Sequence, residues 1–447
     1  MTDPSRLDAC FEGVIPSVIA TTGPDGEPNI SYLSHVTRVD DDHIALSNQF
    51  FGKTAANLRG NPCATILMVD GRTGAQFRVE ALFVRSETQG PLFAHMDAQL
   101  TASSAQLGMS NTMKLKGIDI FRILSISAPP TQAPVAPADT APVPSLPALA
   151  AAVTAIDTAS EISTACEALL DASLAVLDAD AAMILMCDHP RDALIAVLSR
   201  GYDAGGAGAE VPFGVGVIGL AASTRQVIRI GDIGRVRRLN AAIDAQTEPE
   251  ARSRRIPLPG LGGALSHMAV PLITGQNLVG VMFVESRSRL AFGIQHEAAA
   301  AILARALATA MRGDDLPVPA AVPGPTRSRP PLTDRVIRVR HYTYDDSVFI
   351  DDAYVIKGVA GRILVFLIET CLEQSRDAFT NREIRLASSL RLPGYRDNLE
   401  TRLILLRRRL EERAAPIRLE PIGRGRIRLV LEGRPELITA GPGEDTI

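Results

Sequence analysis

The chain has 447 residues, of which 46% are hydrophobic and 21% are charged, and its formal net charge is −4 at pH 7. This length exceeds what one hydrophobic core normally supports, so it predicts about three domains. No apolar run reaches the roughly 18 residues of a membrane helix, and the amino terminus lacks an apolar signal segment, so we expect a cytoplasmic protein without membrane contact.

Two proline-rich segments divide the sequence. Residues 127–147 contain seven prolines and residues 313–334 contain six, and this composition is typical of extended linkers. The resulting prediction is a first domain at 1–126, a linker at 127–147, a second domain at 148–312, a linker at 313–334, a third domain at 335–436 and a tail at 437–447. The five cysteines are scattered without a C-x-x-C pair, which argues against a disulfide framework and a metal site.

The first domain has the pattern of an antiparallel β-barrel with helical insertions. Short β-rich runs alternate with turn signals such as Asp25-Gly26, and helices are expected at residues 53–59 and 91–107. A Gly52-Lys53-Thr54 triplet opens the first of these helices. It is not a P-loop, because the position that requires the first glycine of that motif is Ser47.

A different kind of phosphate site remains possible at this corner. Ser47 and Asn48 end a strand, and Lys53 and Thr54 start a helix, so hydroxyls, a positive charge and free backbone amides converge there. The alternative is a solvated lysine at a helix start, and the motif alone does not decide between the two.

The segments "GEPNISYLS" (26–34), "ALSNQFFGKTAANLRGNP" (45–62) and "GAQFRVEALFVR" (74–85) make this domain resemble the pyridoxamine 5'-phosphate oxidase-like FMN-binding split barrel. The resemblance implies an FMN cofactor in a homodimer, although related barrels hold F420 or haem. It implies that the flavin phosphate is bound by Ser47, Asn48, Lys53 and Thr54. It also implies that the strand around Asn29, Ser31 and Ser34 runs along the isoalloxazine ring, and that Gln76 lies near the ring. The basic residues that grip pyridoxal phosphate in the true oxidases are not found, so we expect no catalytic residues.

The second domain begins and ends with helical patterns and has strands between them, which indicates an α+β layered domain. The segments "PFGVGVIGLAASTRQVIRIGDI" (212–233) and "HMAVPLITGQNLVGVMFVES" (267–286) resemble a GAF domain. The resemblance implies an α/β sandwich that senses a small-molecule effector, whose identity the residues do not specify. A dimerisation module without any ligand is the alternative.

The third domain is basic. Residues 357–434 hold 17 Lys and Arg against 10 Asp and Glu, a balance of +7, which leaves −11 for the remainder. In the helix expected after Asp397, Leu399, Leu403, Leu406 and Leu410 form one apolar stripe. A polar face of Asn398, Arg402, Arg409 and Arg413 lies beside that stripe, and Arg424 and Arg426 occupy the tip of a following hairpin. Such a basic surface favours double-stranded DNA as the partner.

"FTNREI", "NLETRLILLRRRLEER" and "IRLEPIGRGRIRLVL" resemble the winged helix-turn-helix output domain of response regulators. The expected fold class is therefore multidomain α+β, with a split β-barrel, a central GAF α/β sandwich and a winged helix. We expect a one-component transcriptional regulator. The alternatives are an FMN-dependent oxidoreductase with regulatory appendages, and a signalling scaffold without ligands.

Overall fold

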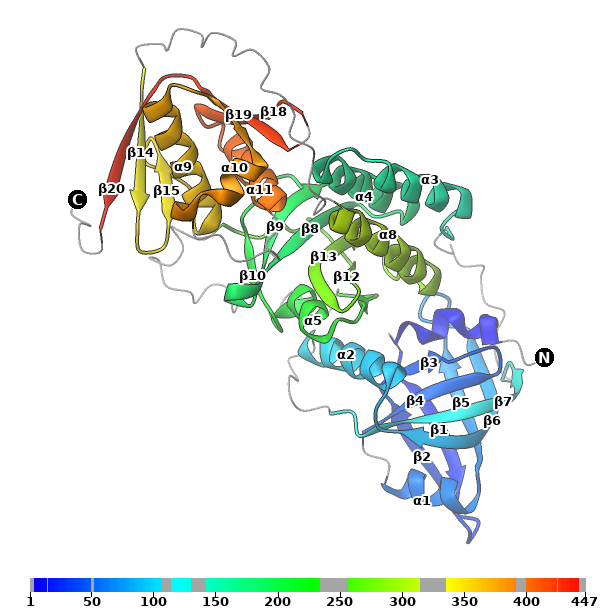
Figure 1. Cartoon of the computed structure of the whole chain (residues 1–447). Coiled ribbons are helices and arrows are strands. Elements are labelled where there is room, and N and C mark those ends of the chain that lie inside the picture. Colours follow the sequence, from blue (N-terminus) through cyan, green and yellow to red (C-terminus); the bar gives the residue numbers. More distant parts are fainter. Residues whose placement is uncertain are drawn as a thin grey trace.

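The computed structural model describes residues 4–13, 15–49, 52–106, 114–129, 142–233, 256–313, 335–390, 399–423 and 425–441. They form three units in a row, with the amino-terminal sheet at one end, a central domain and a carboxyl-terminal domain at the other end (Figure 1). Within these residues, no helix is both long and apolar enough to cross a membrane.

The amino-terminal unit is a curled, seven-stranded half-barrel sheet in which every paired strand is antiparallel, in the order β2-β1-β5-β6-β7-β4-β3. Its elements are η1 (Pro4–Glu12), β1 (Ser17–Thr22), β2 (Pro28–Leu33), β3 (Val36–Arg38), β4 (His43–Asn48), α1 (Gly52–Gly60), β5 (Cys63–Val69), β6 (Gln76–Glu87), α2 (Pro91–Gln106) and β7 (Gly117–Ser127). β2 and β3 are separated at Ser34 and His35, where His35 donates its backbone N–H to the hydroxyl of Ser47.

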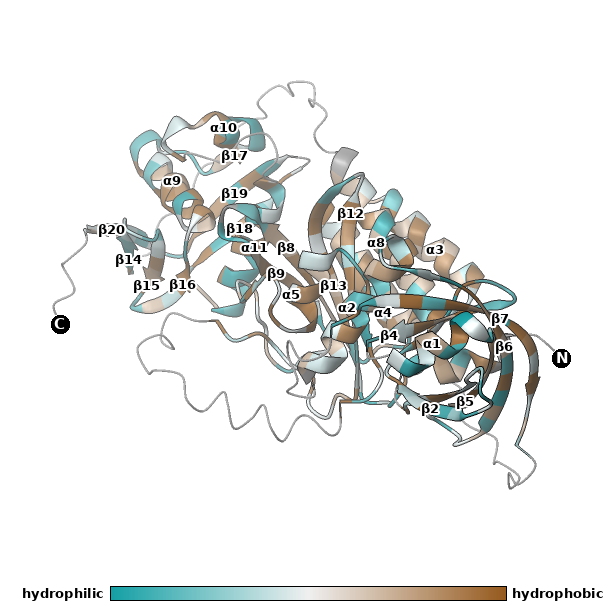
Figure 2. Cartoon of the chain, turned by 90° about the horizontal axis from the view of Figure 1, so that it is seen from below, coloured by the Kyte–Doolittle hydropathy of each residue, from teal (hydrophilic) through white to brown (hydrophobic). Residues whose placement is uncertain are grey.

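The central domain has a six-stranded antiparallel sheet in the order β10-β9-β8-β13-β12-β11. It comprises α3 (Leu146–Asp157), α4 (Ile162–Val176), β8 (Ala181–Asp188), η2 (His189–Arg191), β9 (Ala193–Arg200), β10 (Glu210–Pro212), α5 (Gly216–Thr224), β11 (Ile228–Ile230), β12 (Ser266–Thr274), β13 (Asn277–Ser286) and α8 (Ile294–Gly313). Helices α3, α4 and α8 cover one face and α5 covers the other (Figure 1). The strands and helices of this domain are largely hydrophobic, which is visible as brown ribbon in Figure 2.

In its described residues, the carboxyl-terminal domain combines two small sheets and three α-helices. One sheet has the order β16-β15-β14-β20 and the other has the order β17-β19-β18. The elements are β14 (Val336–Tyr342), β15 (Ser347–Ile350), β16 (Ala353–Ile356), α9 (Val359–Gln374), β17 (Ala378–Thr380), α10 (Asn381–Leu386), η4 (Ser388–Leu390), α11 (Leu399–Glu412), β18 (Ile417–Pro421), β19 (Arg426–Leu431) and β20 (Arg434–Ala440). Thr380 caps α10 by accepting a hydrogen bond from the backbone N–H of Glu383 at 3.1 Å.

Two domain boundaries differ from the sequence-based prediction. β20 continues to Ala440 and pairs in parallel with β14, so the boundary expected at 436 falls inside a strand and the segment expected as a tail begins within the sheet. Helix α3 begins at Leu146, inside the segment assigned to the first linker. Proline at the start of a helix is tolerated because its missing N–H would be unpaired there, and Pro147 follows this rule.

Polar and apolar contacts join the first two units. Helix α2 packs on α5 through Ala98 and Ala102, which belong to the same core cluster as the α5 side chains. The guanidinium of Arg229, on β11, reaches the Glu12 carboxylate of η1 and also lies 3.3 Å from Glu297 of α8. The half-barrel is therefore fixed to the central domain through η1 and α2.

Candidate functional site

Three of the expected cofactor residues meet at the start of α1. The Thr54 hydroxyl accepts a hydrogen bond from the Asn29 side-chain amide at 2.9 Å and lies 2.8 Å from the Ser31 hydroxyl. Asn29 and Ser31 alternate along β2 and therefore point to the same face, toward α1. The structure thus brings Asn29, Ser31 and Thr54 into one polar cluster, in which Thr54 is only 1% exposed.

Lys53 stands next to this cluster and remains accessible. Its side chain is 57% exposed, and its ammonium lies 3.1 Å from the carboxylate of Glu27, which is 66% exposed. An ion pair this exposed is weak, because water screens both charges. The Lys53 ammonium can therefore leave Glu27 for a ligand with little loss of free energy.

Asn48 lies at the same end of the sheet, but its side chain forms a hydrogen bond with Asp119 and not with the Thr54 cluster. Its side-chain amide donates to the carboxylate of Asp119 on β7 at 3.1 Å, and Ser86 donates its hydroxyl to the other carboxylate oxygen. Burial raises the pKa of Asp119, and these two hydrogen bonds lower it in part. The expected contact of Asn48 with a cofactor therefore has to compete with a buried acceptor.

Ser34 and Ser47 have internal roles. The Ser34 hydroxyl donates to the side-chain oxygen of Gln49 at 2.8 Å, and the Ser47 hydroxyl accepts from the backbone N–H of His35 at 3.0 Å. Ser47 is 2% exposed, so its hydroxyl is turned toward the protein. Both side chains fasten the turn between β2 and β3 against the end of β4.

Gln76 lies far from the Thr54 cluster along the sheet. It is exposed at the start of β6 and pairs with Val69, whereas Ala81 of β6 is level with Ala64, Thr21 and Asn29 in the strand register. Five residues of strand separate Gln76 from Ala81, which corresponds to roughly 17 Å. Any single ligand that touches both Gln76 and Thr54 must therefore be elongated and run along the strands.

The second candidate site, the basic face of α11, is not exposed. Arg402 is 6% exposed and Arg409 is 5% exposed, because α11 packs against β9 and α4 of the central domain and against β16 of its own domain (Figure 1). Arg402 lies 3.3 Å from the Asp188 carboxylate, and the Arg409 guanidinium donates to the backbone carbonyl of Val355 at 2.8 Å. The expectation that Arg402 and Arg409 belong to an exposed basic surface is therefore wrong for this conformation.

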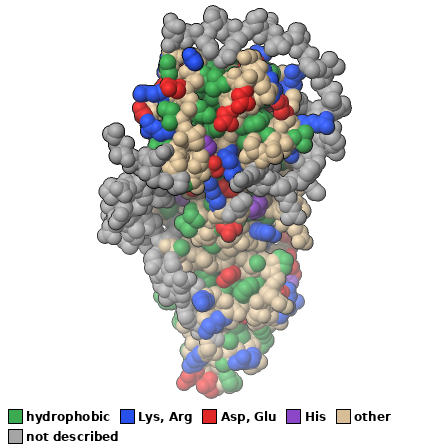
Figure 3. Space-filling view, turned by 60° about the vertical axis from the view of Figure 1, so that its left-hand side comes forward, with side chains coloured by type: hydrophobic (Ala, Val, Ile, Leu, Met, Phe, Trp, Pro, Cys, Tyr) green, Lys and Arg blue, Asp and Glu red, His purple; other side chains and the backbone are tan. Residues whose placement is uncertain are grey.

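The remaining members of the expected DNA-binding set are dispersed. Arg413 is exposed just beyond the end of α11, and Arg426 is partly exposed at the start of β19. Asn398 and Arg424 lie outside the described residues. On the face shown in Figure 3, the described basic and acidic side chains are interspersed rather than separated into a basic stripe.

The contacts that α11 makes with the central domain were not predicted from the sequence. Arg408 contacts Glu167 of α4, and Glu412 accepts a hydrogen bond from the backbone N–H of Ala207 at 3.1 Å. One signal was available: Ile404 and Leu405 lie outside the leucine stripe and are apolar, and both are buried. A helix with apolar residues on two faces is expected to be covered on both.

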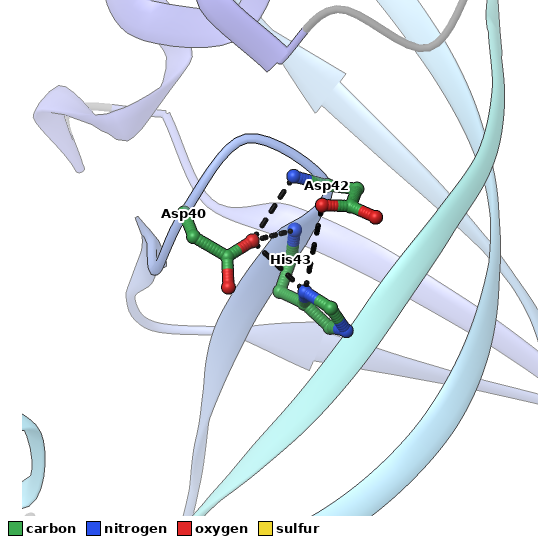
Figure 4. Close-up of side chains that lie close together, drawn as sticks. All are labelled: Asp40, Asp42 and His43. Carbon is green, nitrogen blue, oxygen red and sulfur yellow. Dashed lines mark hydrogen bonds and ion pairs between the residues drawn. The ribbon is translucent and has the colours of Figure 1, made fainter.

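Asp40, Asp42 and His43 also place ligand-type atoms close together, in the β3–β4 turn (Figure 4). One carboxylate oxygen of Asp40 accepts from the backbone N–H groups of Asp42 and His43 and contacts the His43 ring at 2.8 Å. This oxygen is therefore occupied in stabilising the turn, as aspartate commonly does. The hydrogen bonds from the Asp42 backbone and the His43 ring hold the pKa of Asp40 below its usual value.

Comparison with known families identifies the first two units. Residues 4–123 match the family model for pyridoxamine 5'-phosphate oxidase, and residues 159–312 match the model for the GAF domain. The chain thus contains a pyridoxamine 5'-phosphate oxidase-like domain followed by a GAF domain, and neither match extends past residue 312. A search of curated proteins found no match.

Solved structures with similar folds cover single domains of this chain. A GAF domain from an Acinetobacter phosphoenolpyruvate-protein phosphotransferase is 16% identical, and the match covers 38% of this chain and 92% of that one with a TM-score of 0.30. An FMN-binding protein from Syntrophomonas wolfei is 17% identical, with 29% and 87% covered and a TM-score of 0.24. An F420 reductase is 16% identical, with 27% and 94% covered and a TM-score of 0.20.

Proposed function

We propose that the chain is a one-component transcriptional regulator in which the half-barrel and the GAF domain sense a ligand and the carboxyl-terminal domain binds DNA as a winged helix. In the conformation described above, α11 is held in a closed state. The observation that carries this proposal is the pairing of Arg402 and Arg408 of α11 with Asp188 and Glu167 of the GAF domain. A carboxylate and a DNA phosphate offer a guanidinium the same kind of partner, so one can replace the other.

The order of elements supports a winged helix. Helices α9, α10 and α11 precede the β18–β19 hairpin, which is the order implied by the resemblance to response-regulator output domains. In such a domain α11 would enter the major groove and the hairpin would contact the neighbouring backbone. Opening of the interface between α11 and the GAF domain would be the regulated step.

The half-barrel is proposed to hold FMN, with the phosphate at Lys53, Thr54, Asn29 and Ser31. These side chains fit a phosphate, because they provide an ammonium, an amide and two hydroxyls at the amino terminus of α1. Bound flavin would supply redox chemistry or a redox signal. A homodimer is proposed from the same resemblance, and the exposed Ile30 and Tyr32 on the edge strand β2, at 70% and 78%, provide an apolar surface for it.

DNA binding is tested with the full-length protein and a fluorescent duplex from the region upstream of its own coding sequence, between 50 and 200 mM salt. We expect Arg413→Ala/Arg426→Ala to weaken binding and to reduce the slope of log affinity against log salt by about 1–2, because each phosphate contact contributes to that slope. The matched control is Arg434→Ala, an exposed arginine on β20. Absent or salt-insensitive binding would contradict the proposal.

The second candidate function is an FMN-dependent oxidoreductase, which the match of residues 4–123 to an oxidase family favours. NAD(P)H consumption by FMN-loaded protein separates the two functions. Sustained turnover with an added electron acceptor would support the enzymatic function. FMN binding without turnover would support the sensory function instead. If the protein does not bind FMN, neither of the two proposed functions involves a flavin.

A further inference from the structure

A cavity lies between the GAF domain and the carboxyl-terminal end of α11. Its volume is ≈ 210 Å³, and it is lined by β9, by the loop over residues 202–207 and by the last turns of α11. The polar side chains on its wall include Arg200, Tyr202, Arg408, Glu411 and Glu412. The cavity therefore lies at the contact between the two domains.

The loop beside this cavity is shaped around a carboxylate. The backbone N–H of Ala207 donates to the Glu412 carboxylate at 3.1 Å. A Cβ atom on Gly205 would lie 2.2 Å from that same carboxylate, and one on Gly206 would lie 2.2 Å from the ring of Pro259. The two glycines thus permit a close approach that residues with side chains would block.

The position of the Glu412 carboxylate in this loop is electrostatically unfavourable. It lies at the carboxyl terminus of α11, where the helix dipole disfavours negative charge. Within α11, the negative charge of Glu412 is balanced by the Arg409 guanidinium, which lies 3.3 Å from its carboxylate. A free carboxylate would make the same hydrogen bond to Ala207 without being held at the negative end of a helix.

Positive groups around the cavity would favour such an anion. Arg200 pairs with Asp171 at 3.6 Å, and this pair is exposed, with 69% of the Asp171 side chain in contact with solvent. Arg408 contacts Glu167 and lies 3.1 Å from Glu411. When α11 withdraws, Arg200 and the Ala207 N–H remain on the GAF side of the cavity as donors.

We propose that this cavity binds a small carboxylate ligand, which replaces Glu412 on the Ala207 N–H and so loosens α11 from the GAF domain. The site is distinct from the flavin position in the half-barrel. The release step rests on the proposed regulator function, whereas the binding step does not. Because the ligand and Glu412 compete for one donor, the ligand's affinity for the released form exceeds its affinity for the closed form, and this difference shifts the equilibrium.

The test uses full-length protein with succinate as the probe and neutral succinamide as its control. Binding is measured by calorimetry, and amide hydrogen exchange is followed over residues 399–412. We expect saturable succinate binding, faster exchange in α11 on binding, and no comparable effect of succinamide. Glu412→Gln weakens the internal competitor, so we expect it to bind succinate about tenfold more tightly, while the exposed Glu420→Gln on β18 leaves the affinity unchanged.

A second variant covers the case in which Glu412→Gln disturbs folding. Gly205→Ala places a methyl group where the carboxylate lies, so it is expected to abolish succinate binding while the far-ultraviolet circular dichroism remains native. No saturable binding to the wild-type protein, or equal affinities in wild type and Glu412→Gln, would overturn the proposal. Succinate binding that loosens α11 without any DNA binding would leave this inference standing and refute the regulator function.

Discussion

Thr54 shows how much of a site depends on one side chain. Its hydroxyl joins Asn29 and Ser31, whereas the resemblance implied that Thr54 binds the flavin phosphate and that Asn29 and Ser31 lie along the flavin ring. The same reasoning gave Ser34 and Ser47 an equal role, although both fasten the β2–β3 turn instead. A sequence shows which polar residues lie near a strand end, but it does not show which of them already have partners inside the protein.

Thr54→Val removes the hydroxyl and keeps the shape of the side chain. The amide of Asn29 then loses its acceptor in a partly buried place, which costs about 1–3 kcal/mol. We expect the free energy of unfolding of the half-barrel to fall by this amount in urea denaturation, with Thr22→Val at the exposed end of β1 as the control. An unchanged unfolding curve would mean that the three side chains do not act as one cluster.

His35 gives the half-barrel a sensitivity to acid. Burial, together with the smaller effects of the nearby His95 and Arg229, lowers the pKa of this histidine from 6.5 to about 4. Between these pH values the unfolded chain binds more protons than the folded one, so stability is complete above pH 6.5 and falls toward pH 4 by at most about 3 kcal/mol. His35→Gln should flatten this dependence in denaturation curves taken at several pH values, whereas the exposed His189→Gln should not.

At the scale of elements, α11 combines a confirmed prediction with a wrong one. The stripe of Leu399, Leu403, Leu406 and Leu410 is buried as expected. The opposite expectation, that Arg402 and Arg409 face solvent, fails because their partners belong to other elements. Asp188 precedes Arg402 by 214 positions, and no local pattern in the sequence relates residues so far apart.

The ion pair between Arg402 and Asp188 should contribute more than any other single contact to holding α11 against the GAF domain. Both side chains are at most 7% exposed, so Asp188→Asn removes a buried negative charge that faces the Arg402 guanidinium, and we expect it to destabilise the packing of α11 on the GAF domain. In a double-mutant cycle with Arg402→Met, we expect the double variant to be destabilised by less than the sum of the two single changes. The cycle is measured by hydrogen exchange in α11, and additive effects would show that the pair does not couple the domains.

At the scale of the whole molecule, three domains are packed end to end (Figure 1). The strand-rich half-barrel, the GAF layers and the basic third unit were all visible in the sequence, because each has its own periodicity and the proline-rich segments separate them. The packing between the units was not visible. Arg229, Glu12 and Glu297 join three segments across the first interface, and their complementarity exists only after folding.

Arg229→Met should uncouple the half-barrel from the GAF domain. Glu12 and Glu297 would then face one another, which costs about 3–5 kcal/mol at pH 7. Burial already raises the pKa of Glu12, and losing the opposing influence of Arg229 raises it more, so the loss of stability should be smaller at pH 5 than at pH 7. Calorimetric scans at both pH values measure this, with the exposed Arg289→Met as the control.

Because β20 pairs with β14, the sheet of the carboxyl-terminal domain can form only after its last strand has been synthesised. β20 is translated after every other strand of its sheet, and it pairs with the first of them along the full length from Val336 to Tyr342. Domains fold as units from the amino terminus while the chain emerges from the ribosome. The surface of the GAF domain that receives α11 can therefore be complete before the last strand of the carboxyl-terminal sheet has been made.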